Sequence, residues 1–321
     1  MSIHRRAFLG LLAGGIAATA APASGGSGQV LGGSAFGSYW RLSLAQPGDA
    51  DTLRGAIGRV IRKIDGAMSP YRPETDLSRF NRAPAGEWQP LSAETRLVLS
   101  TALDMNTRTG GAFDPTVGPV VGRFGFGPIP AGPTGNLSDL ETGEDAARKR
   151  RAGLTLDLCG IAKGRALDLI GEALVDRGIT DFVAELGGEV LTRGAHPSGR
   201  AWQIAVEASS AGERAVVIRP GTRAVATSGD APQGFAVGGR RYGHIIDPRS
   251  GAPAKGTVAA ATVIADSAMQ ADALATALCS RDADGALALA DALAVDARLT
   301  LRDGATLRTV MTGRFAAHLA S

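Results

Sequence analysis

Residues 154–184 read LTLDLCGIAKGRALDLIGEALVDRGITDFVA. The apolar run at 154–158 predicts a short buried strand, and the glycine step after it leads into a predicted helix over 161–177 that Gly178 ends. A second strand is predicted from residue 182. This stretch divides the chain, because the residues before it predict mostly helices and the residues after it predict mostly short strands.

The two halves differ in their periodicity. Apolar residues at helical spacing predict helices over 49–68 and 92–108, and residues 39–44 alternate as a strand does. The second half predicts further elements from its hydrophobic runs and turn residues: strands over 182–184, 189–192, 202–207, 215–219, 223–227 and 257–265, hairpins around Gly238-Gly239 and Asp303-Gly304, and helices over 267–278 and 282–294. Without a regular strand–helix alternation, we expect an α+β fold with mixed or antiparallel sheets flanked by helices.

The composition fits one large domain or two closely joined lobes. Of 321 residues, 44% are hydrophobic and 20% charged, which is enough to bury a sizeable core. The Gly/Pro-rich stretch 125–135 is the predicted boundary between lobes. The formal net charge of +3 falls to +1 without the two arginines of the first 23 residues, which gives no electrostatic reason to expect nucleic-acid binding. Two cysteines, Cys159 and Cys279, do not indicate a disulfide framework.

The N-terminus has the pattern of an export signal. Arg5-Arg6 precede Phe8-Leu9, a short apolar run follows at 11–21, and Ala21-Pro22-Ala23 supplies small residues for cleavage. The order matches a twin-arginine signal peptide at residues 1–23, removed after about Ala23. We therefore expect a bacterial periplasmic protein whose mature domain is 24–321. No other stretch is long and apolar enough to span a bilayer.

The step from residue 154 to residue 164 is a candidate phosphate site. Asp157 ends the predicted strand, and Lys163 falls in the first turn of the predicted helix, where unpaired N–H groups attract anions. A common structural alternative is a turn that binds nothing, with Lys163 as a solvated surface charge. The sequence has no GxGxxG after a strand, no P-loop, no GxSxG and no CxxC, which excludes the usual dinucleotide, kinase, hydrolase and redox motifs.

A second candidate site lies in the predicted helix that follows Ser267. Asp272 and Thr276 are four residues apart and so share one face of the helix. A carboxylate and a hydroxyl one turn apart offer two hard oxygens, which suit Mg²⁺. The residues around them are small, which lets another backbone approach. The structural alternative is an acid that stabilises the start of the helix, with Thr276 bonding back to it.

Two further segments carry polar groups. His244 is the one histidine in a motif-like setting, ahead of the turn residues 247–251, and can act as a general base. Residues 227–230, Thr-Ser-Gly-Asp, end a predicted strand with hydroxyls, a glycine and a carboxylate. Each segment also has a structural reading: Asp247 and Arg249 can pair locally, and residues 227–230 can close a turn.

These segments, in this order, resemble the FAD:protein FMN transferase family, also called the ApbE family. The resemblance runs from about residue 33 to about residue 279 and rests on seven stretches: MSPYRPETDLSRFN at 68–81, FDPTVGP at 113–119, LDLCGIAKG at 156–164, ELGG at 185–188, TSGD at 227–230, HIIDPRSG at 244–251 and ADALAT at 271–276. Each stretch is modest alone, and seven in order are specific. The family implies a fold with the FAD site between two joined lobes.

The resemblance also implies a ligand for several residues. Mg²⁺ would be held by the main-chain carbonyl of Ala162 with Asp272 and Thr276. Asp157 and Lys163 would contact the adenosine and diphosphate parts of FAD. The implied flavin and cofactor contacts are the side chains and backbone of Phe36, Tyr71, Ser228, Gly229 and Ile245.

His244 would be the catalytic residue, assisting the hydroxyl that accepts FMN. Two positions depart from the family: Cys159 stands where a small Gly- or Ser-like residue is usual, and Ala231-Pro232-Gln233 follow Asp230 where a tyrosine is frequent.

The implied reaction transfers FMN from FAD to a Ser or Thr hydroxyl of an acceptor protein and releases AMP. The acceptors of this family resemble membrane-attached redox proteins that carry flavin. Two alternatives keep the same site: an FAD pyrophosphatase that uses water to give FMN and AMP, and a non-catalytic periplasmic flavin-binding protein.

Overall fold

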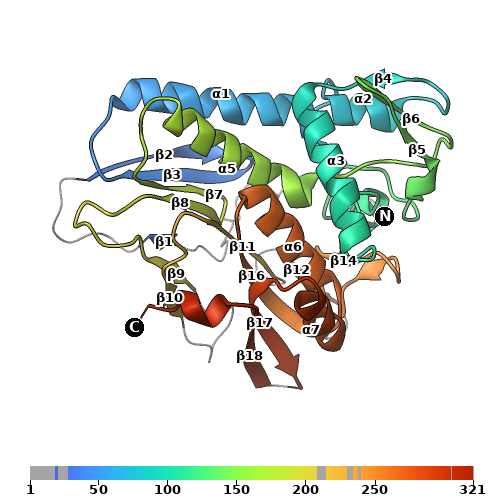
Figure 1. The fold of residues 1–321 in the computed structure, drawn as a ribbon. Helices are drawn as coiled ribbons and strands as arrows, with labels where there is room; N and C mark the ends of the chain where they lie inside the picture. The colour runs from blue at the N-terminus through green and yellow to red at the C-terminus, as the bar shows by residue number, and fades with distance from the viewer. Residues whose placement is uncertain are drawn as a thin grey trace.

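The computed structural model describes residues 19–20, 28–207, 215–229, 234–237, 240–304 and 306–320. Within this part of the chain an eight-stranded sheet forms the centre of the molecule (Figure 1). Every neighbouring pair of its strands is antiparallel. Across the sheet the order is β18 (Thr306–Thr312), β17 (Asp296–Asp303), β16 (Val258–Ala265), β11 (Ala224–Gly229), β8 (Glu189–Arg193), β7 (Phe182–Leu186), β3 (Ser38–Leu44) and β2 (Gln29–Ala35).

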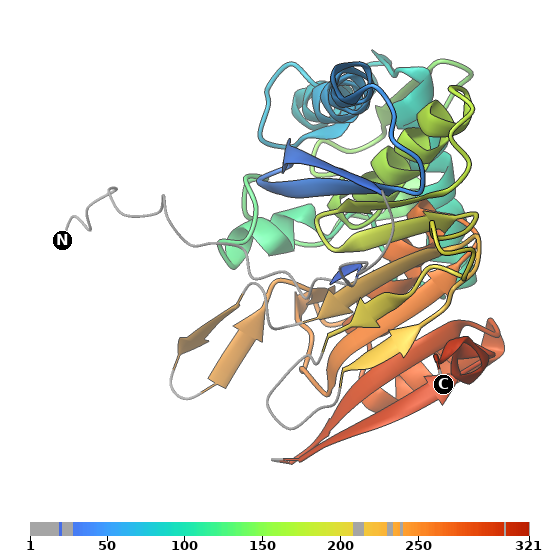
Figure 2. The same cartoon turned by 90° about the vertical axis from the view of Figure 1, so that its left-hand side faces the viewer.

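The N-terminal and C-terminal strands occupy opposite edges of this sheet. Figure 2 shows the first strands in blue and the last strands in red at its two ends. The second half of the chain supplies most of the strands between them, as its short hydrophobic runs predict. The expected α+β class, with an antiparallel sheet flanked by helices, is confirmed.

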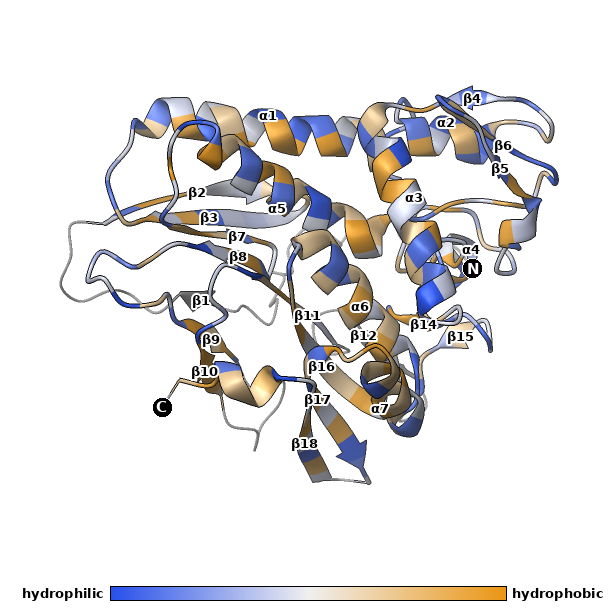
Figure 3. Ribbon diagram, viewed as in Figure 1, coloured by the Kyte–Doolittle hydropathy of each residue, from blue (hydrophilic) through white to orange (hydrophobic). Residues whose placement is uncertain are grey.

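The helices lie in two groups: the long helices that flank the sheet and several short ones. Their bounds are α1 (Ala50–Met68), α2 (Asp76–Arg82), α3 (Ala93–Arg108), α4 (Gly118–Arg123), α5 (Cys159–Val175), α6 (Ala268–Ser280) and α7 (Ala283–Ala292), with 3₁₀ turns η1 (Leu137–Asp139) and η2 (Phe315–His318). The amphipathic pattern of α1 predicts a half-buried helix, and Leu53, Ile57 and Ile64 are its buried face (Figure 3).

Two helices cover one face of the sheet and meet each other. Helix α5 packs on β7 and β8, α6 packs on β11 and β16, and the two helices pack together, with α1 lying outside α5. The main hydrophobic core fills the space between them and includes Leu42, Leu167 and Leu278. The start of α5 therefore lies against α6, near the first residue of β8 and the end of β11.

The opposite face of the sheet carries a smaller core. Val183 and Val190 point to this face and pack with Trp202, Ile204 and Ile218. The last three belong to or adjoin a small sheet formed by β1 (Thr19–Ala20), β9 (Ile204–Val206) and β10 (Val216–Ile218). Alternate side chains of β7 therefore pack into the two cores, because both faces of this strand are covered.

Short strand pairs complete the described structure. They are β4 (Gln89–Pro90), β6 (Ala146–Lys149) and β5 (Leu140–Thr142) in one sheet, β12 (Gly234–Val237) with β13 (Arg240–Gly243), and β14 (Ile246–Asp247) with β15 (Ala252–Pro253). The predicted turn at Gly238-Gly239, the export signal apart from residues 19–20, its cleavage site, and residues 230–233 lie outside the described residues. Among the described residues, no helix has the length and apolarity needed to cross a bilayer.

The strand predicted at 154–158 is wrong: these residues lie outside the helices and strands. The Asn81 side chain takes the place of a neighbouring strand, because its amide oxygen accepts from the Leu156 N–H at 2.7 Å and its amide nitrogen donates to the Leu156 carbonyl at 2.8 Å. Sequence periodicity detects a buried apolar run but not the partner that satisfies its backbone.

Other elements differ from the predictions in extent. Helix α5 begins at Cys159, two residues before the predicted start, so Lys163 lies one turn inside the helix rather than in its first turn. The short helices α2 and α4 and the strand β2 were not predicted. The two helices have seven and six residues, so they show little helical periodicity for a pattern to detect.

We predict that Asp76→Asn destabilises the fold by about 1–2 kcal/mol at neutral pH, since hydrogen bonds to a charged group are lost. The carboxylate accepts from Ser92 N–H at 2.7 Å and Thr95 Oγ1 at 2.8 Å, and pairs with Arg79 at 2.5 Å. Burial alone would raise the pKa of Asp76, but the Ser92 N–H and these partners lower it.

Because the folded pKa is lowered, this stabilisation exists above the pKa of the unfolded chain and is lost as the pH falls through the folded value. Thermal unfolding of both proteins at pH 7 and in acid checks this. A difference in melting temperature that stays the same in acid would contradict it.

Candidate functional site

The candidate site lies where the start of α5 meets α6. A side chain at Gly164 would place its Cβ 2.6 Å from the carbonyl carbon of Ala268, a distance that real Cβ atoms do not adopt. A Cβ at Gly160 would lie 3.3 Å from Thr276 Oγ1. The two glycines therefore allow the backbone of α5 to approach α6 more closely than any other residue would allow.

The side chain of Asp272 in α6 reaches the backbone of α5. Its side chain is buried, with the residue 3% exposed, and its Oδ2 accepts from the Gly164 N–H at 3.2 Å. Burial raises the pKa of Asp272, against the lowering effect of the Lys163 ammonium and of the Gly164 N–H. A carboxylate in this position is held by one N–H and one nearby cation, which leaves its other oxygen positions available to a ligand.

Thr276 lies one turn after Asp272 and faces the end of β11. Its Oγ1 is 3.4 Å from Ser228 Oγ, and the Ser228 carbonyl accepts from Cys279 Sγ at 3.3 Å. Gly229, the last residue of β11, is buried beside them. The structure thus brings together the start of α5, which contains Ala162, with Asp272, Thr276 and the end of β11.

Lys163 pairs with a residue that the sequence did not single out. Its ammonium donates to Oε1 of Glu189, the first residue of β8. Burial alone would lower the pKa of Lys163, but Glu189 and Asp272 together raise it above its usual range. Burial, with the Asp272 charge, raises the pKa of Glu189 to about 7 although Lys163 acts in the opposite direction. Lys163 is therefore a cation that pairs with the buried Glu189 carboxylate and feels the negative charge of the buried Asp272 carboxylate.

Asp157 lies at the entrance to α5. Its Oδ1 accepts from the Cys159 N–H at 2.9 Å, so it satisfies an amide at the start of the helix. Tyr71 is close by, and burial of its hydroxyl together with the neighbouring Cys159 and Asp157 raises its pKa. Tyr71 as a whole is nevertheless 69% exposed. Burial and Asp157 also raise the pKa of Cys159, so its thiol stays protonated.

The remaining predicted contacts come from neighbouring turns. Phe36 lies at the β2–β3 turn with a positive φ of 48° and packs partly against the main core, as does Ile245. His244 follows β13, and its ring meets the edge of Phe126 with 6.3 Å between ring centroids. These three residues come from separate segments of the chain, and nothing in the sequence pattern alone relates them to one another.

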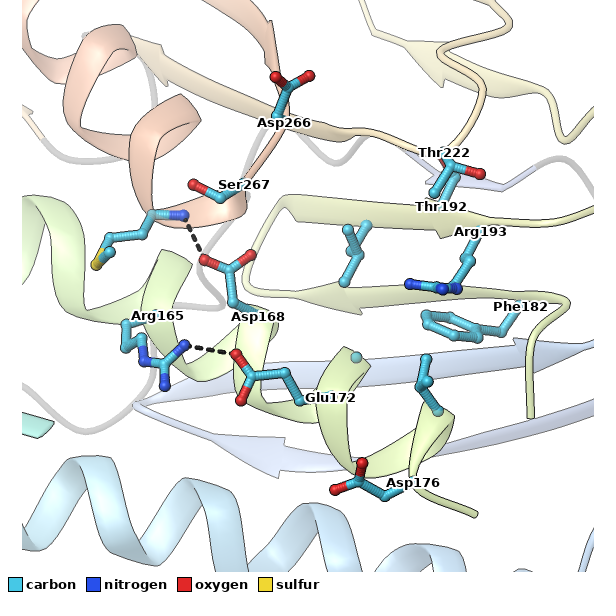
Figure 4. A pocket seen from close by; sticks show the side chains of 14 residues that line it. Arg165, Asp168, Glu172, Asp176, Phe182, Thr192, Arg193, Thr222, Asp266 and Ser267 are labelled. Atoms are coloured by element: carbon cyan, nitrogen blue, oxygen red, sulfur yellow. Dashed lines mark hydrogen bonds and ion pairs between the residues drawn. The ribbon is translucent and has the colours of Figure 1, made fainter. Parts of the chain in front are cut away.

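A second, half-buried acid attaches α5 to α6 farther along the helix. The Asp168 carboxylate of α5 accepts from the N–H groups of Ala268 at 2.7 Å and Met269 at 3.0 Å, which begin α6 (Figure 4). Arg165 and Glu172, which lie before and after Asp168 in α5, form an ion pair at 2.7 Å. They line the edge of a groove of about 440 Å³ between α5, β8 and the start of α6. No local sequence pattern indicates this role for Asp168, because its partners are about 100 residues away.

The fold and the junction define an α+β protein with a buried acid–hydroxyl–lysine site between two helices on an antiparallel sheet. A family model described as the ApbE family matches residues 36–299. The chain belongs to the ApbE family.

Curated relatives agree with this assignment. A protein of Vibrio cholerae named FAD:protein FMN transferase is 37% identical over 82% of this chain and 84% of its own length. A Haemophilus influenzae protein of the same name is 33% identical over 81% of this chain and 83% of its own length.

Solved structures have the same fold. The flavin transferase ApbE of Vibrio cholerae superposes with a TM-score of 0.81 at 32% identity, covering 91% of this chain and all of that one. The flavinyl transferase ApbE of Pseudomonas stutzeri in its apo form gives a TM-score of 0.83 at 29% identity, covering 92% of this chain and 98% of that one.

We predict that Gly164→Ala destabilises the protein by about 1–3 kcal/mol, because the added methyl group forces α5 away from α6. Gly66→Ala in α1 is the matched control: nothing lies within 4 Å of its Cβ position, and alanine is the better helix former. Denaturant unfolding of the two variants checks this. Equal stability of Gly164→Ala and the wild-type protein would show that the close approach is not required.

Proposed function

We propose that this chain is an FAD:protein FMN transferase, which moves FMN from FAD onto a Ser or Thr hydroxyl of an acceptor protein and releases AMP. Membership of the ApbE family and the names of its relatives support the class of reaction. The observation that carries the proposal is the buried Asp272 carboxylate against the start of α5, one turn from the Thr276 hydroxyl.

The oxygens at this junction fit Mg²⁺. Asp272 supplies a carboxylate, Thr276 a hydroxyl and Ala162 a main-chain carbonyl, and all three are hard ligands of the kind that Mg²⁺ prefers. The junction holds two buried carboxylates and one lysine, so an added cation would balance its charge. When bound, Mg²⁺ would offset negative charge on the diphosphate of FAD and on the departing AMP.

The chain's own residues hold the rest of FAD. Lys163 is a fixed ammonium with three N–H donors, of which Glu189 takes one and a diphosphate can take others. Asp157, at the start of α5, would contact the adenosine part of FAD. The exposed ring of Tyr71, with Phe36 and Ile245, offers apolar surface to the flavin. Ser228 and Gly229, at the end of β11, would add further contacts to FAD.

Transfer exchanges one phosphorus–oxygen bond for another. The bond from the FMN phosphorus to the bridging oxygen breaks, a bond to the acceptor hydroxyl forms, AMP leaves with the bridging oxygen, and the hydroxyl proton is released. His244 takes this proton, because an imidazole accepts protons near neutral pH. The protein mainly positions groups and balances charge in such a reaction.

The proposed setting is the bacterial periplasm, with acceptors that are membrane-attached redox proteins carrying flavin. The twin-arginine pattern at residues 1–23 supports export, and residue 24 would begin the mature chain. Intact-mass measurement of the exported protein is expected to give a chain that starts close to residue 24. A mass that retains Arg5 and Arg6 would contradict this.

We predict that the purified protein, mixed with FAD, MgCl₂ and a periplasmic redox domain from the same bacterium, adds FMN to that domain and releases an equal amount of AMP. Intact-mass spectrometry of the acceptor and chromatography of AMP measure both products. Asp272→Asn should lower the rate by about 100-fold or more, since the only charged ligand of the proposed Mg²⁺ is lost. EDTA should stop the reaction, and added Mg²⁺ should restore it.

His244→Ala is expected to lower turnover by about 10²–10⁴-fold while FAD still binds, as for a general base. Asp284→Asn, an exposed carboxylate in α7, is the matched control and should behave as the wild-type protein does. If AMP is released at the same rate with and without acceptor, and the acceptor gains no mass, the protein is an FAD pyrophosphatase and not a transferase. If FAD binds tightly but no AMP is released at any Mg²⁺ concentration, the protein is a non-catalytic flavin-binding protein.

A further inference from the structure

Glu189 is a buried carboxylate of which one oxygen accepts a hydrogen bond and the other does not. The residue is 3% exposed, and its Oε1 accepts from Lys163, whereas its Oε2 is buried and makes no hydrogen bond within the described structure. A buried carboxylate is costly to keep unless it is paired, and it is expensive to leave an acceptor unused. A structural salt bridge alone does not explain why a residue in this position leaves one oxygen without a donor.

The backbone around Glu189 is rigid. It follows Gly187 and Gly188, whose φ angles of +62° and +106° form the turn between β7 and β8, and the Gly187 N–H donates to the Tyr39 carbonyl at 2.9 Å. A Cβ at Gly187 would lie 3.6 Å from Glu189 Oε2. The carboxylate is therefore held on a sheet strand by a turn that packs directly against it.

Lys163, in contrast, has a long flexible side chain. A lysine loses considerable rotamer entropy when it is fixed, and an unpaired one near the start of a helix would extend into solvent. Glu189, which comes from the sheet, is the carboxylate that pairs with the ammonium, and Asp272 of α6 adds a second negative charge nearby.

We propose that Glu189 is a positioning residue that holds the Lys163 ammonium where it contacts the diphosphate of a dinucleotide. The inference rests on the proposed function, because that function places a diphosphate at Lys163. Glu189 acts through Lys163, because its Oε1 accepts from the ammonium, whereas its Oε2 lies on the side of the Gly187–Gly188 turn. The ligand class it serves is a nucleoside diphosphate, whether free or as part of FAD.

The test is a double-mutant cycle with two ligands. Binding of ADP in the presence of MgCl₂ and binding of riboflavin are measured by calorimetry for the wild-type protein, Glu189→Gln, Lys163→Met and the double variant. Glu189→Gln keeps the shape of the side chain and removes its charge. It should weaken ADP binding by about 10–100-fold, as loss of a supporting partner typically does. Riboflavin, which has no phosphate, should bind each variant equally.

The cycle separates positioning from packing. If Glu189 acts through Lys163, Glu189→Gln should have no further effect on ADP binding in the Lys163→Met background. Glu185→Gln is the matched control: Glu185 is a buried carboxylate just before the same Gly-Gly turn, but it faces the opposite side of the sheet and accepts from Tyr39 Oη at 2.6 Å. It should leave ADP binding unchanged.

Four results would overturn the inference. Three concern the variants: unchanged ADP binding by Glu189→Gln, equal loss of ADP and riboflavin binding, and an effect of Glu189→Gln that is the same in both backgrounds. The fourth is the absence of ADP binding by the wild-type protein. Flavin transfer by the wild-type protein is measured separately. If transfer fails while the binding cycle behaves as expected, the proposed reaction is wrong and the role of Glu189 stands.

Discussion

The contact between the backbones of α5 and α6 is the constraint on which the site depends. It exists because Gly164 has no side chain at the point where α6 begins, so Asp272 can accept directly from the Gly164 N–H. Asp168 fixes the same helix pair from the other direction by accepting from the first N–H groups of α6. With two such attachments the helices cannot slide, and the acid and hydroxyl of α6 stay opposite the start of α5.

The antiparallel sheet determines what lies beneath this contact. Strands β8 and β11 are neighbours in the sheet, with Ala224 opposite Leu191. As a result, the first residue of β8 presents Glu189 to Lys163, and the end of β11 presents Ser228 to Thr276. Charge explains why the groups belong together. Two buried carboxylates around one ammonium leave an excess of negative charge, which a bound divalent cation would offset.

Local patterns predicted most of the regular structure. The stripe of α1 and the N-cap of α6, where Ser267 accepts from the Gln270 N–H, agree with their sequence patterns, because each depends on residues within a few positions of one another. The strand predicted at 154–158 failed for the opposite reason: its backbone is satisfied by Asn81, a residue 75 positions away. Glu189 and Asp168 were not recognised as parts of the site, since an isolated acid in a strand or helix has no local signature.

The sequence by itself determined the α+β class, the positions of the long helices and many strands, and a set of polar residues that resemble one family. It could place Asp272 and Thr276 on one face of a helix, because a helical turn is a local object with a fixed period. Only the tertiary structure decided that this face meets Gly164, 108 residues earlier, and that Lys163 is held by Glu189. Such contacts depend on packing between distant segments, and no local period or cap records them.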